Sequence, residues 1–162
     1  MIYVADTSAV VALLSKVDHA HMAVLELYRE TGKHWVLPWC ILPEVDYLAG
    51  ERLGRGPQTA FINDLAEGAW MVEWGEERDL QRARELDHEY RDLRLGLVDS
   101  TVMALAERLG AAAIVTLDLR HFGAVKLAGS PRIVPRDGNP LSAGRRSRAG
   151  SRARQSLGRR PR

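Results

Sequence analysis

Cysteine is nearly absent from the sequence, and long hydrophobic runs are missing. The single cysteine, Cys40, excludes an intramolecular disulfide and is typical of proteins in a reducing compartment. The apolar stretch at the start of the chain follows no basic segment and is interrupted at Asp6. It therefore predicts neither a signal peptide nor a membrane span. We expect a cytoplasmic protein with no segment in a membrane.

Motifs of several enzyme classes are also absent. Gly54 and Gly56 do not make a phosphate-binding loop, because no Gly-rich strand-to-helix turn surrounds them and no Gly-Lys-Ser/Thr follows. Cys40 has no catalytic partner pattern near it, so we expect a small buried residue. Any chemistry of this chain must come mainly from its acids.

The formal net charge of +2 conceals two parts of opposite sign. The last 19 residues, 144–162, hold eight arginines and no acid, which leaves 15 basic and 21 acidic residues in 1–143. With 46% apolar residues in the chain, we expect one folded domain over 1–143. We expect 144–162 to be an Arg-rich disordered tail. Such a tail either binds a nucleic acid electrostatically or is a non-native or weakly constrained extension, and both interpretations stay open.

Short apolar segments alternate with helical patterns along the domain. The strand candidates are residues 2–5, 35–37, 70–72, 113–116 and, more weakly, 133–134. The helix candidates are residues 8–16, 19–31, 40–53, 58–66, 77–90 and 98–109. This alternation predicts an α/β sandwich with a mainly parallel sheet.

Four acids occupy positions where ligands gather in such folds. Asp6 directly follows the first strand, and Asp118 comes just after the strand at 113–116. Glu44 and Asp99 lie near the starts of two helices. Carboxyl ends of parallel strands and the helix starts that follow them face one edge of the sheet, so we expect the four carboxylates to converge.

Converging carboxylates repel one another unless a cation joins them. Mg²⁺ and Mn²⁺ prefer oxygen ligands, and such an ion can activate water and neutralise charge on a phosphate. The four acids therefore suggest metal-assisted phosphodiester chemistry. Each acid also has a structural interpretation: Asp6 and Asp118 suit turns or helix caps, and Glu44 and Asp99 suit helix starts.

Four ordered segments resemble the motifs of PIN-domain ribonucleases, in particular the VapC-type toxins of type II toxin–antitoxin pairs. They are VADTSAVVALL, LPEVDYLAGERLG, LGLVDSTVMALAERLGA and AIVTLDLRHFGAV. The resemblance covers about residues 1–135 and implies a PIN-like three-layer sandwich, with a central mainly parallel sheet flanked by helices. The Arg-rich segment is a departure, because VapC-type chains usually stop soon after the last strand.

The resemblance also implies roles for individual residues and partners. Asp6 and Asp99 would hold Mg²⁺ most directly, Glu44 and Asp118 would complete the pocket, and Thr7 and Thr116 would orient carboxylates. It further implies cleavage of RNA by a metal-activated water, a toxin homodimer, and a VapB-type antitoxin. A basic side chain of such an antitoxin could neutralise the acids.

Two other functions stay open. Asp6 could accept a phosphoryl group, although Ser8 stands where a second Asp would be expected and no Lys follows the strand near Thr116. Alternatively, the chain is a non-catalytic RNA- or protein-binding module whose acids only dock a partner.

Several other residues have a structural and a functional interpretation. Basic side chains near the acids could hold RNA phosphates, but solvent exposure is favoured for Arg91 and Arg94. His121 could be a packed loop anchor, and Asp46 is expected at the surface or in a dimer contact. The tryptophans could stack on bases, but the core or a dimer interface is the preferred reading for Trp35, Trp39, Trp70 and Trp74.

Overall fold

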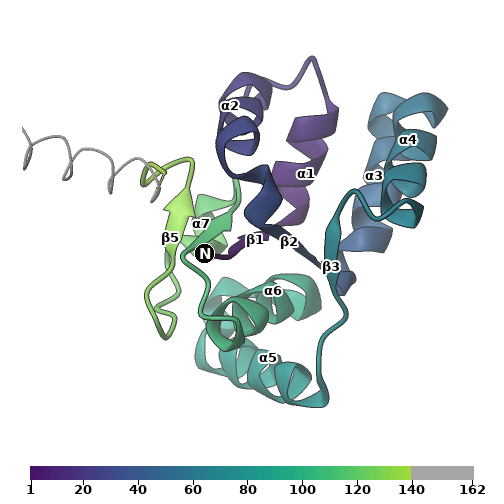
Figure 1. Cartoon of the computed structure of the whole chain (residues 1–162). Helices are drawn as coiled ribbons and strands as arrows, with labels where there is room; N and C mark the ends of the chain where they lie inside the picture. Colours follow the sequence, from purple (N-terminus) through teal and green to yellow (C-terminus); the bar gives the residue numbers. More distant parts are fainter. Residues whose placement is uncertain (140–162) are drawn as a thin grey trace, which may run out of the picture.

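Five short parallel strands form the centre of the molecule, in the order β3-β2-β1-β4-β5 (Figure 1). The structure is a computed structural model that describes residues 1–139. The strands are β1 (Tyr3–Ala5), β2 (Trp35–Pro38), β3 (Met71–Glu73), β4 (Ala113–Val115) and β5 (Arg132–Val134). The predicted α/β sandwich with a parallel sheet is confirmed.

Helices cover the sheet on both sides (Figure 1). On one side lie α1 (Thr7–Leu14), α2 (His21–Thr31), α3 (Leu42–Leu53) and α4 (Arg55–Ala66), and on the other lie α5 (Glu77–Glu89) and α6 (Gly96–Arg108). A single turn, α7 (Leu119–Phe122), follows β4. Short 3-10 segments precede β2, α3 and α6, namely η1 (Gly32–His34), η2 (Trp39–Ile41) and η3 (Arg91–Leu93).

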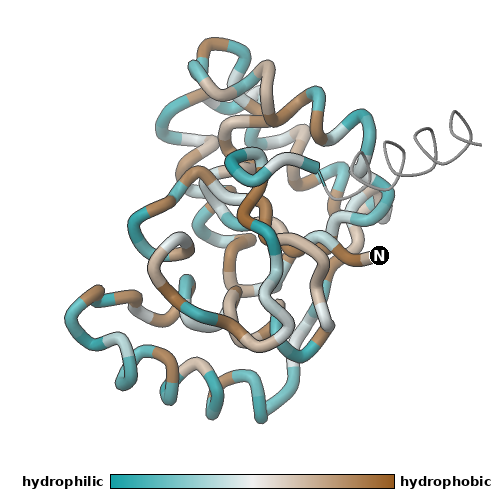
Figure 2. The backbone as a smooth tube through the Cα atoms, turned by 90° about the vertical axis from the view of Figure 1, so that its left-hand side faces the viewer, coloured by the Kyte–Doolittle hydropathy of each residue, from teal (hydrophilic) through white to brown (hydrophobic). Residues whose placement is uncertain are grey.

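The core forms where the central strands meet α1 and α6. β1, β2 and β4 are buried along their whole lengths, which is why they read as continuous apolar runs. In α6 every residue from Ser100 to Ala106 is buried. The outer helices instead show hydrophobic positions recurring between hydrophilic ones (Figure 2). The central strands are thereby held rigidly, and their carboxyl ends are fixed in place.

Two partly buried arginines, Arg82 and Arg108, join α5 to α6 and to β3. Arg108 donates to Asp79 (2.6 Å), Glu73 (2.9 Å) and Glu76 (3.2 Å). Arg82 makes a two-pronged contact with Glu107, at 2.7 and 3.1 Å. Asp79 is only 3% exposed and also accepts the backbone N–H of Glu76, so its charge depends on Arg108 for compensation.

Two elements differ from the sequence-based expectation. The single turn α7 was not predicted as a helix, because four residues are too few to show a periodic pattern. Helix α4 begins at Arg55 rather than at residue 58, so Gly56 and Pro57 lie in its first turn. First-turn residues have no intrahelical acceptor for their N–H groups, which makes proline acceptable there.

The predicted Arg-rich tail and the last residues of the predicted domain lie outside residues 1–139. Within the described residues, no helix is both long enough and apolar enough to cross a bilayer.

The Arg108 contacts make a prediction about stability. Replacing Arg108 with Ala leaves the buried Asp79 carboxylate without its cation, so we expect the free energy of unfolding to fall by about 3 kcal/mol. Urea denaturation measures this change. The matched control is Arg84→Ala, an exposed arginine of α5, which should change the value by less than about 0.5 kcal/mol. Equal effects of the two substitutions would contradict this role of Arg108.

Candidate active site

The candidate site lies where the strand order reverses, between β1 and β4. The chain builds β2 and β3 on one side of β1, then crosses to build β4 and β5 on the other. Crevices at the carboxyl ends of strands form at such reversal points. Ala5 pairs with Val115 here, and the Asp6 backbone N–H continues the ladder by donating to the Val115 carbonyl at 2.9 Å.

Asp6 is held by two hydroxyl groups from the two sides of this point. Its Oδ2 accepts from the Oγ of Ser8 at 2.7 Å and from the Oγ1 of Thr116 at 2.9 Å. The carboxylate is only 4% exposed, and burial raises the pKa of Asp6 although these hydrogen bonds oppose the shift. Asp6 is also the N-cap of α1, accepting the Ser8 backbone N–H at 3.4 Å. Asp6 therefore caps a helix, as its structural interpretation predicted, and it also lies in the candidate site.

Glu44 reaches the same region from the first turn of α3. The Thr7 hydroxyl, next to Asp6 in the chain, donates to Glu44 Oε2 at 2.5 Å. Because Thr7 is itself buried, this bond ties the exposed Glu44 to the end of β1. The expected role of Thr7 and Thr116 as donors to carboxylates is confirmed.

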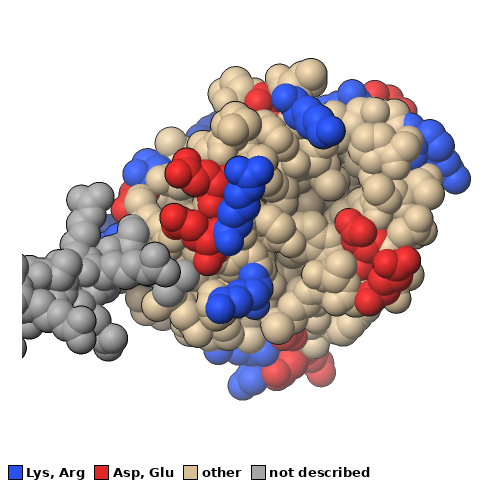
Figure 3. Space-filling view, turned by 45° about the horizontal axis from the view of Figure 1, so that its top comes forward, with Lys and Arg blue, Asp and Glu red and all other residues tan. Residues whose placement is uncertain are grey.

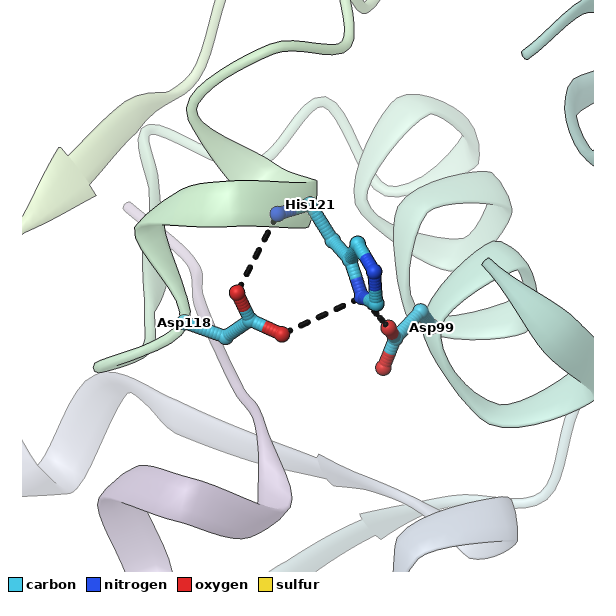
Figure 4. A group of neighbouring side chains, drawn as sticks. All are labelled: Asp99, Asp118 and His121. Atoms are coloured by element: carbon cyan, nitrogen blue, oxygen red, sulfur yellow. Dashed lines mark hydrogen bonds and ion pairs between the residues drawn. The ribbon is translucent and has the colours of Figure 1, made fainter. Parts of the chain in front are cut away.

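Asp99, Asp118 and His121 form the tightest group in the site (Figure 4). The Nδ1 atom of His121 lies 2.5 Å from Asp99 Oδ2 and 3.1 Å from Asp118 Oδ2. The other oxygen of Asp118 accepts the backbone N–H groups of Arg120 and His121 at 2.9 and 3.1 Å, so Asp118 also caps α7. One carboxylate thus comes from the first turn of α6 and the other from the end of β4, with an imidazole from α7 between them.

Electrostatics link this group to the other two acids. Burial raises the pKa of Asp99 to about 6; the charges of Asp6 and Asp118 add to this effect, and the contact with His121 opposes it. Burial also raises the pKa of Cys40 to about 12, and Asp6, Glu44 and Asp99 add to that shift. All four predicted acids therefore act on the same small region, where their charges disfavour one another.

These donors fit a divalent cation. Oxygen atoms of Asp99 and Asp118 and a ring nitrogen of His121 lie within 4.8 Å of one another, so they could hold one ion together. Asp6 and Glu44 are outside this close group, although hydroxyl bonds hold both at the adjoining edge. A cation would offset the burial of the Asp99 carboxylate and its repulsion by Asp6 and Asp118, which together raise the pKa of Asp99.

Two residues of the site were not assigned to it from the sequence. His121 was read as a packed anchor or a phosphate contact, yet it lies between two of the acids. Its spacing of three residues from Asp118, across a single helical turn, is the signal that could have placed it. Ser8 was considered only as a helix cap or a missing Asp, but its hydroxyl joins Asp6 to the backbone of Leu117.

Residues outside the site divide between surface and core. Arg91 and Arg94 are exposed, as expected, and Cys40 is buried. Asp46 is half-buried, and its Oδ1 has no hydrogen-bond partner among residues 1–139; its expected place at the surface or in a dimer contact stays a prediction. On the face shown in Figure 3, acidic and basic side chains form small separate groups around an uncharged centre. Although acidic residues outnumber basic ones in the domain, they do not form a continuous acidic surface on this face.

Comparison with known proteins gives the family. A model of the PIN domain matches residues 3–126. The chain belongs to the PIN-domain family. The family expectation drawn from the four motifs is confirmed, whereas the metal-binding roles of Asp6, Glu44, Asp99 and Asp118 stay a prediction.

Relatives of this PIN domain include Ribonuclease VapC26 of Mycobacterium tuberculosis, which is 32% identical over 127 residues, 78% of this chain and 94% of the relative. Among solved structures, VapC20 of M. tuberculosis, a sarcin–ricin loop cleaving toxin, gives a TM-score of 0.70 at 20% identity, over 78% of this chain and 97% of the other. DNA-bound VapBC of Salmonella typhimurium gives 0.62 at 17% identity, over 82% and 96%. These structural matches confirm the PIN-like fold.

The raised pKa of Asp99 makes a prediction about pH. The folded chain keeps this proton between the ordinary pKa of 3.8 and about 6, where the unfolded chain has lost it. The contribution of Asp99 to stability is therefore fully present below about pH 4 and is lost as the pH rises through about 6.

Asp99→Asn carries no charge at any pH. In metal-free protein we expect it to raise the free energy of unfolding on the order of 1–2 kcal/mol near pH 8, and by much less near pH 4. Urea denaturation in EDTA at both pH values measures the difference from the unsubstituted protein. The same difference at both pH values would show that Asp99 is not protonated in the folded chain near pH 4–6.

Proposed function

We propose that this protein is a metal-dependent endoribonuclease and the toxin of a type II toxin–antitoxin pair. The observation that carries the proposal is the meeting of Asp99, Asp118 and His121 beside Asp6 at the reversal point of a PIN-type sheet. The 32% identity to Ribonuclease VapC26, over nearly the whole of that relative, supports RNA as the substrate.

The four acids have distinct tasks in this proposal. Asp99 and Asp118, which lie within reach of one ion, would hold it together with Asp6 from the adjoining strand end, and Glu44 would complete its surroundings. The hydroxyls of Thr116 and Ser8 keep Asp6 Oδ2 in one orientation, and Thr7 does the same for Glu44. His121 aligns Asp99 with Asp118 through its contacts to both carboxylates. Substrate can therefore meet carboxylates that need little rearrangement.

The proposed ion is Mg²⁺, with Mn²⁺ as a substitute, because the site offers mainly carboxylate oxygens. Such an ion lowers the pKa of a bound water and stabilises negative charge on the phosphate. No covalent bond to the protein is required. Arg120, exposed next to His121, is suitably placed to contact an RNA phosphate.

The same comparisons support a proposal about the binding partners of this protein. The solved VapBC complexes of S. typhimurium and Rickettsia felis resemble this chain in fold, at TM-scores of 0.62 and 0.60. We propose a VapB-type antitoxin that places a basic side chain against the four acids, and a homodimer of the toxin. The proposed location is the cytoplasm, where RNA is accessible and the single Cys40 stays reduced.

Phosphoryl transfer through Asp6 is less well supported. Asp6 Oδ2 is occupied by two hydroxyl donors, and the carboxylate is almost fully buried. No lysine follows β4 near Thr116 to neutralise a phosphoryl group. The geometry therefore favours Asp6 as a ligand rather than a nucleophile.

The test is to incubate purified, antitoxin-free protein with total cellular RNA, with Mg²⁺, with Mn²⁺ or with EDTA, and to map the new 5′ ends. We expect discrete cuts that require metal. Asp99→Ala should reduce cleavage by more than about 100-fold, since it removes a direct ligand.

The matched control is Glu67→Ala, because Glu67 is an exposed acid at the end of α4, outside the acidic site. It should cut as the unsubstituted protein does. Metal-independent cutting, or equal cutting by Asp99→Ala, would refute the proposed mechanism. RNA binding that persists in EDTA without any cleavage would favour the non-catalytic module.

A further inference from the structure

Trp74 does not lie in the core, whereas Trp35 is buried there and Trp39 and Trp70 pack against it. Trp74 follows β3 directly and is 74% exposed, whereas Trp35 is 1% exposed. An indole ring in water leaves a large apolar surface uncovered. Of the two expected places for Trp74, the core and a dimer interface, its exposure excludes the core, which raises the question of what covers the ring in function.

Trp74 borders a small hollow beside the acidic site. The hollow has a volume of about 160 Å³, and its walls include Trp39, Trp74, Gly75, Glu77, Leu80 and Thr101. The two indole rings do not contact each other, whereas Tyr28 contacts both Trp35 and Trp70 elsewhere in residues 1–139. The aromatic faces bordering the hollow are therefore not used by a neighbouring ring.

A buried hydroxyl without a partner forms part of the same hollow. Thr101 is fully buried, and its Oγ1 makes no hydrogen bond within the described residues. Leaving a buried polar atom unpaired costs free energy, so such atoms are uncommon in folded proteins. A ligand that offered a donor or an acceptor here would recover that cost.

The hollow has a rigid framework. Gly75 has a φ of +83°, and a Cβ atom on it would lie 2.9 Å from Trp39 Nε1, so the indole of Trp39 packs directly on the glycine backbone. Arg108 joins Glu73 of β3 to Asp79 of α5, on either side of Trp74. The segment that carries Trp74 is therefore fixed at both ends.

The hollow and the four acids lie at the same edge of the sheet, because Trp74 follows β3 and Asp6 follows β1, two strands apart in one parallel sheet. Trp39 follows β2, the strand between β1 and β3, and η2 packs against α6, the helix that carries both Asp99 and Thr101. A chain whose phosphate lies at the acids can therefore place a neighbouring base at the hollow.

We propose that this hollow is a base-binding subsite, in which Trp74 stacks on a nucleobase next to the cleaved phosphate of a single-stranded RNA. The inference rests on the proposed ribonuclease function and adds a determinant of its specificity. Aromatic side chains stack on the unpaired bases of single-stranded RNA, while hydrogen bonds read the edges of those bases. Here Trp74 supplies the stacking face and the walls supply the polar groups.

The walls can distinguish one base edge from another. Trp39 Nε1 can only donate a hydrogen bond, and the Glu77 carboxylate, which has no partner in residues 1–139, can only accept. The Thr101 hydroxyl can do either. A base bound between these groups is therefore selected by its pattern of donors and acceptors.

The competing occupant is a protein surface, from a second copy or another chain. A volume of about 160 Å³ with polar walls and a place next to the acids favours a single planar base. A protein contact would instead bury Trp74 by apolar packing and change the oligomeric state when Trp74 is removed.

The test compares cleavage and oligomeric state for Trp74→Ala, Trp74→Phe and Thr101→Val. The control is Met22→Ala, an exposed apolar residue of α2 outside the hollow. The substrates are short single-stranded RNAs that vary one position at a time around the mapped cut, and the readout is kcat/KM for each. Light scattering reports the oligomeric state, and urea denaturation reports folding.

We expect Trp74→Ala to lower kcat/KM by about 5- to 100-fold on the preferred RNA, with Trp74→Phe recovering most of it. Thr101→Val should flatten the base preference at one position without loss of stability, because it removes an unpaired hydroxyl while keeping the shape. Met22→Ala should match the unsubstituted protein.

Two results would overturn the subsite. One is cleavage by Trp74→Ala with the same rate and base preference as the unsubstituted protein. The other is a change of oligomeric state in Trp74→Ala while the preference is kept, which identifies a protein contact. If the unsubstituted protein cuts no RNA under either metal, the proposed function fails and the subsite fails with it. The first two results would leave that function intact.

Discussion

The contact between the ends of β1 and β4 is the constraint on which the site depends. The Asp6 backbone extends the ladder to Val115, and the Thr116 hydroxyl then crosses to the Asp6 carboxylate. Ser8 closes the same junction by binding both Asp6 and the backbone of Leu117. Because β1 and β4 are fully buried, this junction cannot shift without disturbing the core. The position of Asp118, and through His121 that of Asp99, follows from it.

The negative charges of the acids make this arrangement of the site energetically unfavourable. Carboxylates are placed where burial raises the pKa of Asp6 and Asp99, which costs stability at neutral pH. The rest of the fold offsets that cost with apolar burial in α6 and with the arginine contacts between α5, α6 and β3. Functional sites commonly carry such locally unfavourable features, supported by the surrounding structure.

The features of the fold and site that depend on residues close in sequence could be predicted, whereas those that depend on residues far apart in the chain could not. The parallel sheet and the positions of Asp6 and Asp118 at strand ends followed from apolar runs and their alternation with helices. The positions of Asp99 and Glu44 in the site followed from their places near the starts of two predicted helices. The contact between His121 and Asp99 could not be predicted, because 22 residues separate the two; only the spacing of three residues from Asp118 pointed to the place of His121. The exposure of Trp74 was not predictable for a related reason: burial next to a strand depends on which strand lies at the edge, and β3 is an edge strand.

Asp6 both caps α1 and contributes a carboxylate to the acidic site, and this has a consequence for how the protein can evolve. Asn caps a helix about as well as Asp, so a substitution at residue 6 can remove the negative charge while α1 still begins at Thr7. The hydroxyls of Ser8 and Thr116 can still donate to an amide oxygen in the same place. Loss of cleavage and loss of folding are therefore separable by one change. A descendant of this protein could therefore lose catalysis, keep the fold, and still bind a partner that recognises the folded surface.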